Sequence, residues 1–577
     1  MTIEYLTLAA YFVILLVVGV VFARLNQGMS DFVRGGARGT WWMVGTSMLM
    51  AGISAFTFTG NGSAAYEAGP TLLAIYAANI LGFVLGGLFL AKWYRQTRAY
   101  TAADVIRQRF GPVVEQFNVV SLLLTMPFQA AIQLWALGTF VTAVFGFPLA
   151  TTIVVIGLIT VTYSAFGGMW GVMATDVVQG IIMFGMTVLV AVLCLVEIGG
   201  VGAFFSYFSD PRYAEAFRFV KEPGQFAQDK FTWSWIIVIF VMQLLTQINL
   251  STATKYLAVK DGREASRAAW WAMGLMIVGS LVWFLPPMVA RFLYEAEVNG
   301  LGISDPSTAA YAVAAQHVLP NGLMGVMIAA MFSATMSSMD MGLSNQTGII
   351  VRNLLPAWRR WRGAAEPDET QQLLLCRSIT AGLGALIIAA SVTLAFQDKF
   401  VMFDAFILLA SVIGTPLGLP LIMGLILRRL PSWGYVAIFL GSLLPSLWSL
   451  LDERLNGAVW TAQERGGWVL AGGLAATLLC VPFRQRGSAV QRAREDEFFT
   501  QMETPVDFEK EIGGSLDGRQ AVLTGRILCV LAGLLLFFLL VPNDTAARWA
   551  IAGLIAFVGV AGGLLWWGGA RHTRMGR

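Results

Sequence analysis

Long apolar segments alternate with short polar stretches from one end of the sequence to the other. Most hold about 20 residues, the length that a helix needs to cross the roughly 30 Å hydrocarbon core of a bilayer. Fifteen such segments lie near residues 3–23, 41–66, 71–93, 117–145, 148–166, 173–198, 232–253, 268–292, 322–350, 373–396, 401–427, 433–450, 466–483, 526–541 and 546–567. The pattern predicts an all-α polytopic membrane protein with about 15 transmembrane helices.

Positive charge between these segments predicts the orientation of the chain. With the N-terminus outside, most of the 38 Lys and Arg residues fall on the cytoplasmic side, among them those of the loop from Lys255 to Arg267, as the positive-inside rule requires. The first residues, Met1–Tyr5, lack the basic region of a signal peptide, so we expect the first span to be retained. The expectation is a multi-pass protein of the plasma (inner) membrane, with the N-terminus outside and the C-terminus cytoplasmic.

Composition excludes several other classes of protein. Only 12% of the residues are charged, about half the fraction of a soluble domain, and a net charge of +4 is too small to suggest nucleic acid. The four cysteines are scattered singly and the two histidines form no HExxH motif, so neither a zinc site nor a disulfide framework is supported. We expect no enzyme activity and no cofactor.

The second apolar segment, residues 41–66, makes a poor continuous helix. It contains Gly52, Gly60 and Gly62 among polar residues, and glycine weakens a helix by roughly 1 kcal/mol relative to alanine. Backbone carbonyls freed in a bilayer need partners, and broken helices of this kind bind ions and substrates in transporters. The alternative is a kink that neighbouring side chains fill.

The ninth segment carries a candidate cation site. Ala334, Ser337 and Ser338 stand at i, i+3 and i+4, on one face of a helix. A carbonyl and two hydroxyls are oxygen ligands suited to a hard cation. Serines in membrane helices also bond back to their own helix, and this alternative stays open.

Two aspartates, Asp176 and Asp340, stand in the cytoplasmic third of their segments. A charge near the bilayer centre costs roughly 2.5–3.5 kcal/mol, so it implies a partner, water or a cation. Asp176 follows a double glycine, and this position favours a functional role for its carboxylate. For Asp340 the simpler interpretation is that it lies at the membrane edge. Asp404 lies near the outer end of its segment, where a polar residue is expected next to a loop.

Several uncharged polar residues stand inside apolar segments, where they either join helices or line a solute cavity. They are Tyr76, Asn79, Gln129, Gln133, Gln243, Gln247 and Asn249. Segments two to four carry no Lys or Arg away from their ends, which favours a neutral or zwitterionic solute. Residues 484–526 mix acidic, basic and apolar positions, and we expect a solvated or interfacial helix there, with a regulatory contact as the alternative.

Four stretches resemble signatures of the sodium:solute symporter family, which includes the sodium–glucose, sodium–proline and sodium–sialic acid cotransporters. They are TAADVIRQRFG (101–111), GGMWGVMATDVVQGIIM (167–183), NLSTATKYLAVKD (249–261) and LPNGLMGVMIAAMFSATMSSMDMGLSN (319–345). The resemblance covers roughly residues 1–450.

The resemblance implies a LeuT-like core of five plus five helices in inverted repeats. The repeats would span 41–198 and 232–427, after an extra helix and loop in 1–40 and before extra helices in 428–577, which include the 484–526 segment. It also implies a sodium site formed by the carbonyls of Met50, Ile53 and Ala334 and the hydroxyls of Ser337 and Ser338. Asp176 matches the family aspartate on the sodium route to the cytoplasm.

The expected function is sodium-coupled symport of a small organic solute, such as a sugar or an amino acid, by alternating access. Candidate solute contacts are Ser54, Thr57, Tyr76, Gln133, Gln247 and Asn249. The chain departs from its relatives in two places: Ser54-Ala55-Phe56-Thr57 replaces an acid- or amide-rich stretch of the sugar cotransporters, and the third core helix lacks the arginine that holds the sialic acid carboxylate. The alternatives are proton coupling, with Asp176 as the proton carrier, and a transporter-like membrane sensor.

Overall fold

A computed structural model describes residues 2–23, 35–249, 254–301, 303, 305–363, 368–396, 401–483, 487–514 and 517–575. In these ranges every regular element is a helix, and the β-bridge between Gly39 and Val259 stands by itself. Residues 250–253, part of the NLSTATKYLAVKD stretch, lie outside the described residues. The expectation of an all-α protein is confirmed.

The α-helices are α1 (Thr2–Ala23), α3 (Trp41–Gly52), α4 (Ala55–Phe58), α5 (Gly60–Ala68), α6 (Leu73–Leu85), α7 (Ala91–Gln96), α8 (Ala102–Phe110), α9 (Pro112–Phe145), α10 (Leu149–Glu197), α11 (Val201–Ser206), α12 (Trp233–Gln247), α14 (Gly262–Trp283), α15 (Leu285–Leu293), α16 (Glu295–Asn299), α17 (Ala310–Val318), α18 (Leu323–Ile349), α19 (Leu355–Arg362), α20 (Glu369–Ala395), α21 (Met402–Leu409), α22 (Thr415–Ile426), α23 (Ser432–Asn456), α24 (Ala462–Cys480), α25 (Ala489–Glu503), α26 (Phe508–Glu511), α27 (Asp517–Leu535) and α28 (Thr545–Met575). Short 3-10 or π turns are η1 (Gly35–Ala37), η2 (Gly69–Leu72), η3 (Gly86–Leu90), η4 (Tyr207–Ser209), η5 (Ala227–Asp229), η6 (Thr254–Ala258), η7 (Pro306–Ala309), η8 (Ile350–Leu354), η9 (Ala410–Gly414), η10 (Val481–Phe483) and η11 (Leu536–Leu540).

Eleven helical stretches in the described residues are long and apolar enough to cross a membrane, and three further apolar helices are shorter. The predicted number of about 15 spans is therefore not confirmed. Two predicted segments, 148–166 and 173–198, belong to the single helix α10, because the backbone stays helical through the glycine pair between them. The second predicted segment is divided instead, and its latter half continues into the third.

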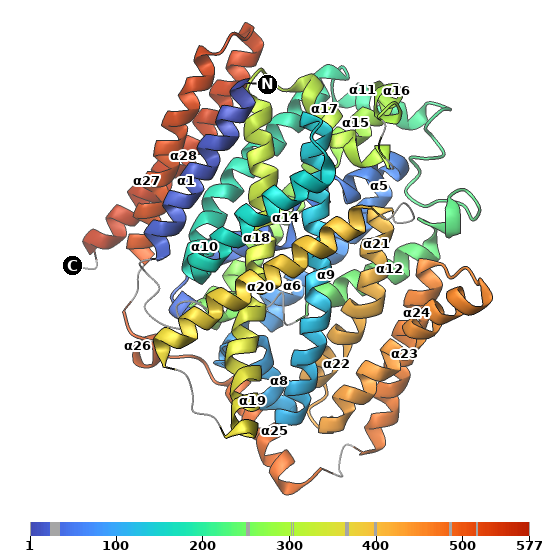
Figure 1. The fold of residues 1–577 in the computed structure, drawn as a ribbon, viewed down its shortest axis with the longest axis vertical. Coiled ribbons are helices and arrows are strands. Elements are labelled where there is room, and N and C mark those ends of the chain that lie inside the picture. The colour runs from blue at the N-terminus through green and yellow to red at the C-terminus, as the bar shows by residue number, and fades with distance from the viewer. Residues whose placement is uncertain are drawn as a thin grey trace.

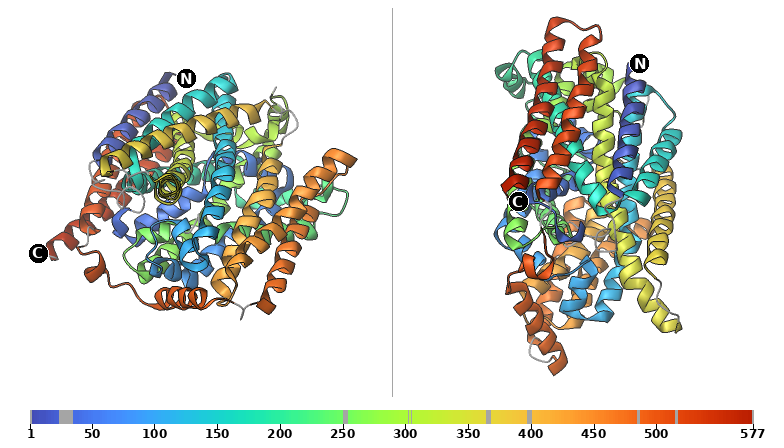
Figure 2. Two further views of the ribbon diagram at one scale, coloured as in Figure 1. Left: turned by 60° about the horizontal axis from the view of Figure 1, so that its bottom comes forward. Right: turned by 90° about the vertical axis from the view of Figure 1, so that its left-hand side faces the viewer.

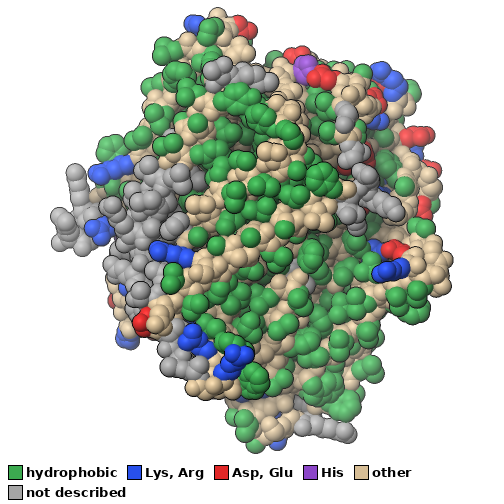
Figure 3. Space-filling view, in the orientation of Figure 1, with side chains coloured by type: hydrophobic (Ala, Val, Ile, Leu, Met, Phe, Trp, Pro, Cys, Tyr) green, Lys and Arg blue, Asp and Glu red, His purple; other side chains and the backbone are tan. Residues whose placement is uncertain are grey.

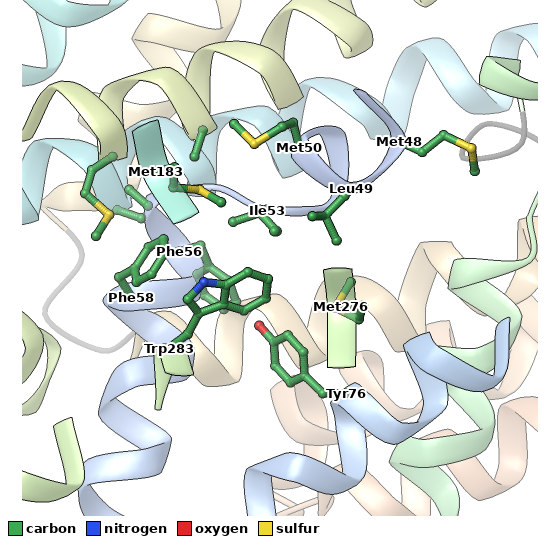
Figure 4. Packing of buried hydrophobic residues seen from close by; sticks show 14 of the residues in the cluster. Met48, Leu49, Met50, Ile53, Phe56, Phe58, Tyr76, Met183, Met276 and Trp283 are labelled. Carbon is green, nitrogen blue, oxygen red and sulfur yellow. The ribbon is translucent and has the colours of Figure 1, made fainter. Parts of the chain in front are cut away.

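The division of the second segment occurs at Ile53 and Ser54. Both residues are extended, with φ/ψ of −116°/140° and −148°/−179°. The Ser54 hydroxyl then accepts a 3.3 Å hydrogen bond from the Phe56 N–H and caps α4, in the manner of an N-cap serine. Figure 4 shows Met50 near the end of α3, Ile53 on the extended stretch and Phe56 at the start of α4. The predicted break is confirmed.

Helix α18 runs through the middle of the molecule (Figure 1) and is buried along nearly all of its length. It packs against α1, α3, α9, α10 and α20. The α27–α28 hairpin lies beside α1 on one flank, and the α23–α24 hairpin lies on the opposite flank (Figures 1 and 2). Hydrophobic side chains cover the middle of the face drawn in Figure 3, where charged side chains are sparse. This surface is what a bilayer requires of a spanning bundle.

The helix expected in 484–526 is present as α25, which packs with one face on α7 and α8. Its apolar residues Phe498, Phe499 and Met502 are buried there. The Glu495 carboxylate pairs with Arg109 at 3.2 Å, and both side chains are 3% exposed or less. The segment is thus part of the packed structure at the lower end of the bundle in Figure 1.

Candidate functional site

The break between α3 and α4, at Ile53 and Ser54, lies against α18. The Ala55 N–H, the first of α4, donates a 2.8 Å hydrogen bond to Thr335 Oγ1. Thr335 stands between Ala334 and the two candidate serines on α18. The first N–H groups of a helix have no partner within it, so this bond fixes where α4 starts relative to α18.

The predicted cation ligands lie on these two elements. Met50 ends the last regular turn of α3, where its carbonyl accepts the Ile53 N–H at 3.2 Å. Ser337 is 1% exposed, and its side chain lies beside the Asp176 carboxylate. A hydroxyl has one donor and two acceptor lone pairs, so this oxygen could still face a cation.

Ser338 has a different environment. Its hydroxyl lies 2.9 Å from the Thr335 carbonyl and 2.9 Å from Gln133 Oε1. Ser338 therefore does make the hydrogen bond to a carbonyl of its own helix, which the sequence offered as an alternative to cation binding. Ala334, the third residue of the face, is fully buried. Among the described residues no group of three His, Cys, Asp or Glu side chains could hold a metal ion, so a cation here would depend on carbonyl and hydroxyl oxygens.

A cavity of about 210 Å³ opens beside the break. All six predicted solute contacts line it: Ser54, Thr57, Tyr76, Gln133, Gln247 and Asn249. Ser338 lines it as well, so the cavity adjoins the candidate cation ligands. The structure thus brings together residues that are far apart in the sequence.

The cavity wall combines amides, hydroxyls and aromatic rings with aliphatic side chains such as Ile75, Leu122 and Leu417. Further amides on the wall are Asn61, Asn79, Gln129, Gln243 and Gln346, and none of the described lining residues is charged. Three of these amides are already engaged: Asn61 donates to the Tyr76 hydroxyl at 2.9 Å, and Gln243 donates to Asn79 at 2.8 Å. Phe56 and Phe406 stack with centroids 4.6 Å apart and form an apolar part of the wall. The cavity thus offers hydrogen-bonding groups beside an apolar surface.

Asp176 lies beneath the cation candidates in a buried network that the sequence did not predict. The Lys255 ammonium is 3.6 Å from Asp176 Oδ2 and donates a 2.7 Å hydrogen bond to Ser47 Oγ. Ser47 in turn donates to Asp176 Oδ2. Lys255 belongs to the stretch whose basic residues were taken as cytoplasmic loop charges, yet its side chain is fully buried.

Asp340 is buried between α10 and α18, where it accepts a hydrogen bond from Ser164. Only 2% of Asp340 is exposed, so its carboxyl group is enclosed by protein, whereas its place at the membrane edge stays a prediction. Asp404, by contrast, is part-exposed and pairs with Lys230 at 2.6 Å, as expected of polarity at the end of a loop.

Sequence reasoning missed three residues of this region: Ser47, Lys255 and Thr335. Thr335 stands inside the serine cluster that was singled out, so its spacing could have pointed to it. Ser47 and Lys255 are separated by 208 residues, and no local pattern connects them.

Comparison with known proteins places this geometry in context. A profile described as the sodium:solute symporter family matches residues 32–441. The sodium/sialic acid symporter NanT of Aliivibrio fischeri is 24% identical over 473 residues, 79% of this chain and 89% of the relative. SiaT of Proteus mirabilis, also a sodium/sialic acid symporter, is 24% identical over 82% of this chain and 95% of the relative. The sodium/glucose cotransporter of Vibrio parahaemolyticus is 23% identical over 67% and 74%.

The fold is also similar to that of a solved transporter structure. A Na+-coupled sialic acid symporter in a substrate-bound, outward-open state superposes with a TM-score of 0.71 at 20% identity. The match covers 84% of this chain and 98% of that protein. At this identity the similarity shows the LeuT-like fold and leaves the solute open.

Proposed function

Because the chain belongs to the sodium:solute symporter family, we propose that it carries a small neutral or zwitterionic organic solute together with sodium by alternating access. The observation that carries the proposal is the break at Ile53 and Ser54, which adjoins both the α18 serines and an amide-lined cavity. In transporters, broken helices at the midplane bind the coupling ion and the solute. The chain has no role as an enzyme in this proposal.

The sodium site uses the carbonyls of Met50, Ile53 and Ala334 and the hydroxyls of Ser337 and Ser338, here named the serine cage. The Ile53 carbonyl lies beyond the last turn of α3, and the Met50 carbonyl, which accepts the Ile53 N–H, keeps a second lone pair. The buried Ser337 hydroxyl supplies another oxygen. Oxygen ligands of this kind suit a hard cation. Sodium that leaves the cage would pass Asp176 on its route to the cytoplasm.

The solute site is the neighbouring cavity, with contacts from Ser54, Thr57, Tyr76, Gln133, Gln247 and Asn249. A carboxylate without a counter-charge would meet no described cation on this wall, although two of the relatives carry sialic acid by name. Amides both donate and accept hydrogen bonds, so they suit sugar hydroxyls or the two ends of an amino acid. A sugar or an amino acid is therefore the class of solute that we propose.

Sodium supplies the driving force for uptake. At a membrane potential of about 150 mV one charge supplies roughly 3.5 kcal/mol. That free energy corresponds to about 300-fold accumulation of a neutral solute before any sodium gradient is added.

The proposed topology has inverted repeats at 41–198 and 232–427 in the inner membrane, with the N-terminus outside and the C-terminus in the cytoplasm. The extra helices of 1–40 and 428–577 would flank this core. A reporter fused after Arg577 should be active only in the cytoplasm, and activity in the periplasm would overturn this orientation.

Purified protein in proteoliposomes tests the function. A thermal-shift screen against sugars, amino acids and carboxylates, with and without sodium, first selects a solute. Uptake of that solute should then require an inward sodium gradient. Uptake that depends on a proton gradient and not on sodium would show that the coupling ion is the proton. Binding of the solute without uptake would favour a membrane sensor.

A further inference from the structure

The negative charge of Asp176 is paired with a positive charge of the protein, the ammonium group of Lys255. Asp176 is 1% exposed and Lys255 is fully buried, and their charged atoms lie 3.6 Å apart. Removing one partner of a buried ion pair is strongly destabilising, because the remaining charge has lost its water. The carboxylate therefore needs a cation at this position, and Lys255 provides one.

Three separate elements build this arrangement. Ser47 comes from α3, Asp176 from α10 and Lys255 from η6. The Ser47 hydroxyl bridges the two charges, accepting from Lys255 and donating to Asp176. A second carboxylate, Asp340, lies close enough for its charge to interact with both Asp176 and Lys255. The surroundings are acidic, which favours a cation at the position of the ammonium.

The Asp176 carboxylate, which pairs with Lys255, also adjoins the serine cage. The Ser337 side chain lies next to the Asp176 carboxylate. Asp176 Oδ1 and the Ser337 hydroxyl face each other, and neither makes a hydrogen bond to a third described group. With Ser47 Oγ and Asp176 Oδ2 these atoms make a set of four oxygens next to the cage. Carboxylate and hydroxyl oxygens are the ligands that a hard cation prefers.

We propose that Lys255 is a tethered cation that takes the place of a second sodium ion at Asp176. The protein then binds one sodium, in the serine cage, and the ammonium satisfies the Asp176 carboxylate. This inference rests on the proposed sodium coupling and specifies its stoichiometry. Lys255 is a specificity-determining residue that acts on the ion site through Asp176 and Ser47.

The experiment counts sodium ions bound to purified full-length protein, using radiolabelled sodium, so that no solute is needed. Wild type should bind one sodium. Lys255→Met removes the ammonium, and the free Asp176 oxygens should recruit a second sodium. Lys255→Met combined with Asp176→Asn should bind one again, because the carboxylate charge is gone. Lys260→Met is the matched control and should bind one, because Lys260 pairs with Asp517 instead.

The outcomes separate the two proposals. Wild type that binds no sodium overturns the proposed function, whereas wild type that binds two, or a Lys255→Met variant that binds one, overturns only the role of Lys255. If Lys255→Met is recovered only at high salt, its melting temperature in sodium chloride and choline chloride decides. Sodium should stabilise Lys255→Met over choline by more than it stabilises Lys255→Met/Asp176→Asn, which keeps only the serine cage. An equal sodium effect in these two variants overturns the tethered cation.

Discussion

The backbone N–H of Ala55 donates a 2.8 Å hydrogen bond to the side-chain oxygen of Thr335, and this bond joins the interrupted helix to the buried helix α18. The ends of an interrupted helix leave backbone groups without helical partners. Thr335 satisfies one of them at the place where the serine cage is proposed. The geometry of the cage thus depends on a residue that is not itself a proposed ligand.

Thr335→Val should loosen this junction, because valine has the same shape but accepts no hydrogen bond. Leaving a buried donor unsatisfied costs about 1–3 kcal/mol, so the melting temperature should fall and the sodium concentration for half-maximal uptake should rise several-fold. Thr347→Val is the control on the same helix, since Thr347 bonds to Thr380 at 2.9 Å. It should lower stability only. An equal change in sodium dependence in both variants would contradict the role of Thr335.

Ser337→Ala or Ser338→Ala should weaken sodium activation by about ten- to a hundredfold. A lost contact to a charge costs roughly 1.5–3 kcal/mol, and an ion in a small dry cage cannot replace the ligand with water. Maximal uptake at saturating sodium should partly recover in Ser337→Ala. Ser338→Ala should also change the half-saturating concentration of the solute, because Ser338 lines the cavity and donates to Gln133. Ser333→Ala is the control, since that hydroxyl bonds to the Ala329 carbonyl and to Tyr11. Normal sodium dependence in the Ser337→Ala/Ser338→Ala double variant would make these serines packing residues.

Gln247→Ala or Asn249→Ala should raise the half-saturating concentration of the solute while sodium binding persists. Both residues line the cavity next to the break, and a removed amide leaves the solute's polar groups without a partner. The expected increase is about tenfold, measured by uptake at saturating sodium. Gln179→Ala, an amide on α10 that donates to Tyr11 at 3.0 Å, serves as the control. Unchanged kinetics in both cavity variants would move the solute site elsewhere.

Arg109→Gln should release α25 from the bundle. The guanidinium pairs with Glu495 at 3.2 Å and donates to the Gly424 carbonyl at 2.9 Å, all in a buried place. Breaking a buried pair by removing one partner costs about 3–5 kcal/mol, whereas replacing both partners with apolar residues costs less. Arg109→Met/Glu495→Met should therefore be more stable than Arg109→Gln in thermal unfolding.

The control for this prediction is Arg107→Gln, since Arg107 is 53% exposed and 3.8 Å from Glu115. Hydrogen exchange of residues 489–503 should increase in Arg109→Gln and stay slow in the control. Equal exchange in the two variants would show that the pair does not hold α25 in place.

The burial of Lys221 predicts that the free energy of unfolding depends on pH. It lies in the loop between α11 and α12, donates to the Ala68 carbonyl at 2.9 Å, and is 2% exposed. Burial lowers the pKa of Lys221 from 10.5 to about 8. Between pH 8 and about 10.5 the unfolded chain keeps a proton that the folded chain has lost, so the contribution of Lys221 to stability rises with pH across this window.

Thermal unfolding of wild type and Lys221→Met from pH 7 to pH 10 measures this contribution. Relative to the variant, wild type should gain about 1–3 kcal/mol over the range, from a shift worth roughly 1.4 kcal/mol per pKa unit. A constant difference between the two proteins would show that Lys221 keeps its proton when folded.

The sequence by itself determined the features that depend on neighbouring residues. Apolar runs of about 20 residues indicate spanning helices because the bilayer sets their length. The break near Gly52 follows from local helix propensity, and the face shared by Ala334, Ser337 and Ser338 follows from the helical repeat. The number of spans was less well determined, because the glycine pair within α10 did not end the helix.

Only the tertiary structure decided which polar groups meet. Lys255 follows an apolar segment and was predicted to be a loop charge, but the packed helices bury its side chain. They also enclose the carboxyl group of Asp340, which no local pattern of the sequence predicted. The same packing gathers amides from distant segments around one cavity and docks α25 on α8. Hydropathy and helix propensity act over a few residues, whereas the pairing of buried charges depends on contacts across the whole fold. A buried charge must find a partner, and which partner it finds is a property of the packed structure.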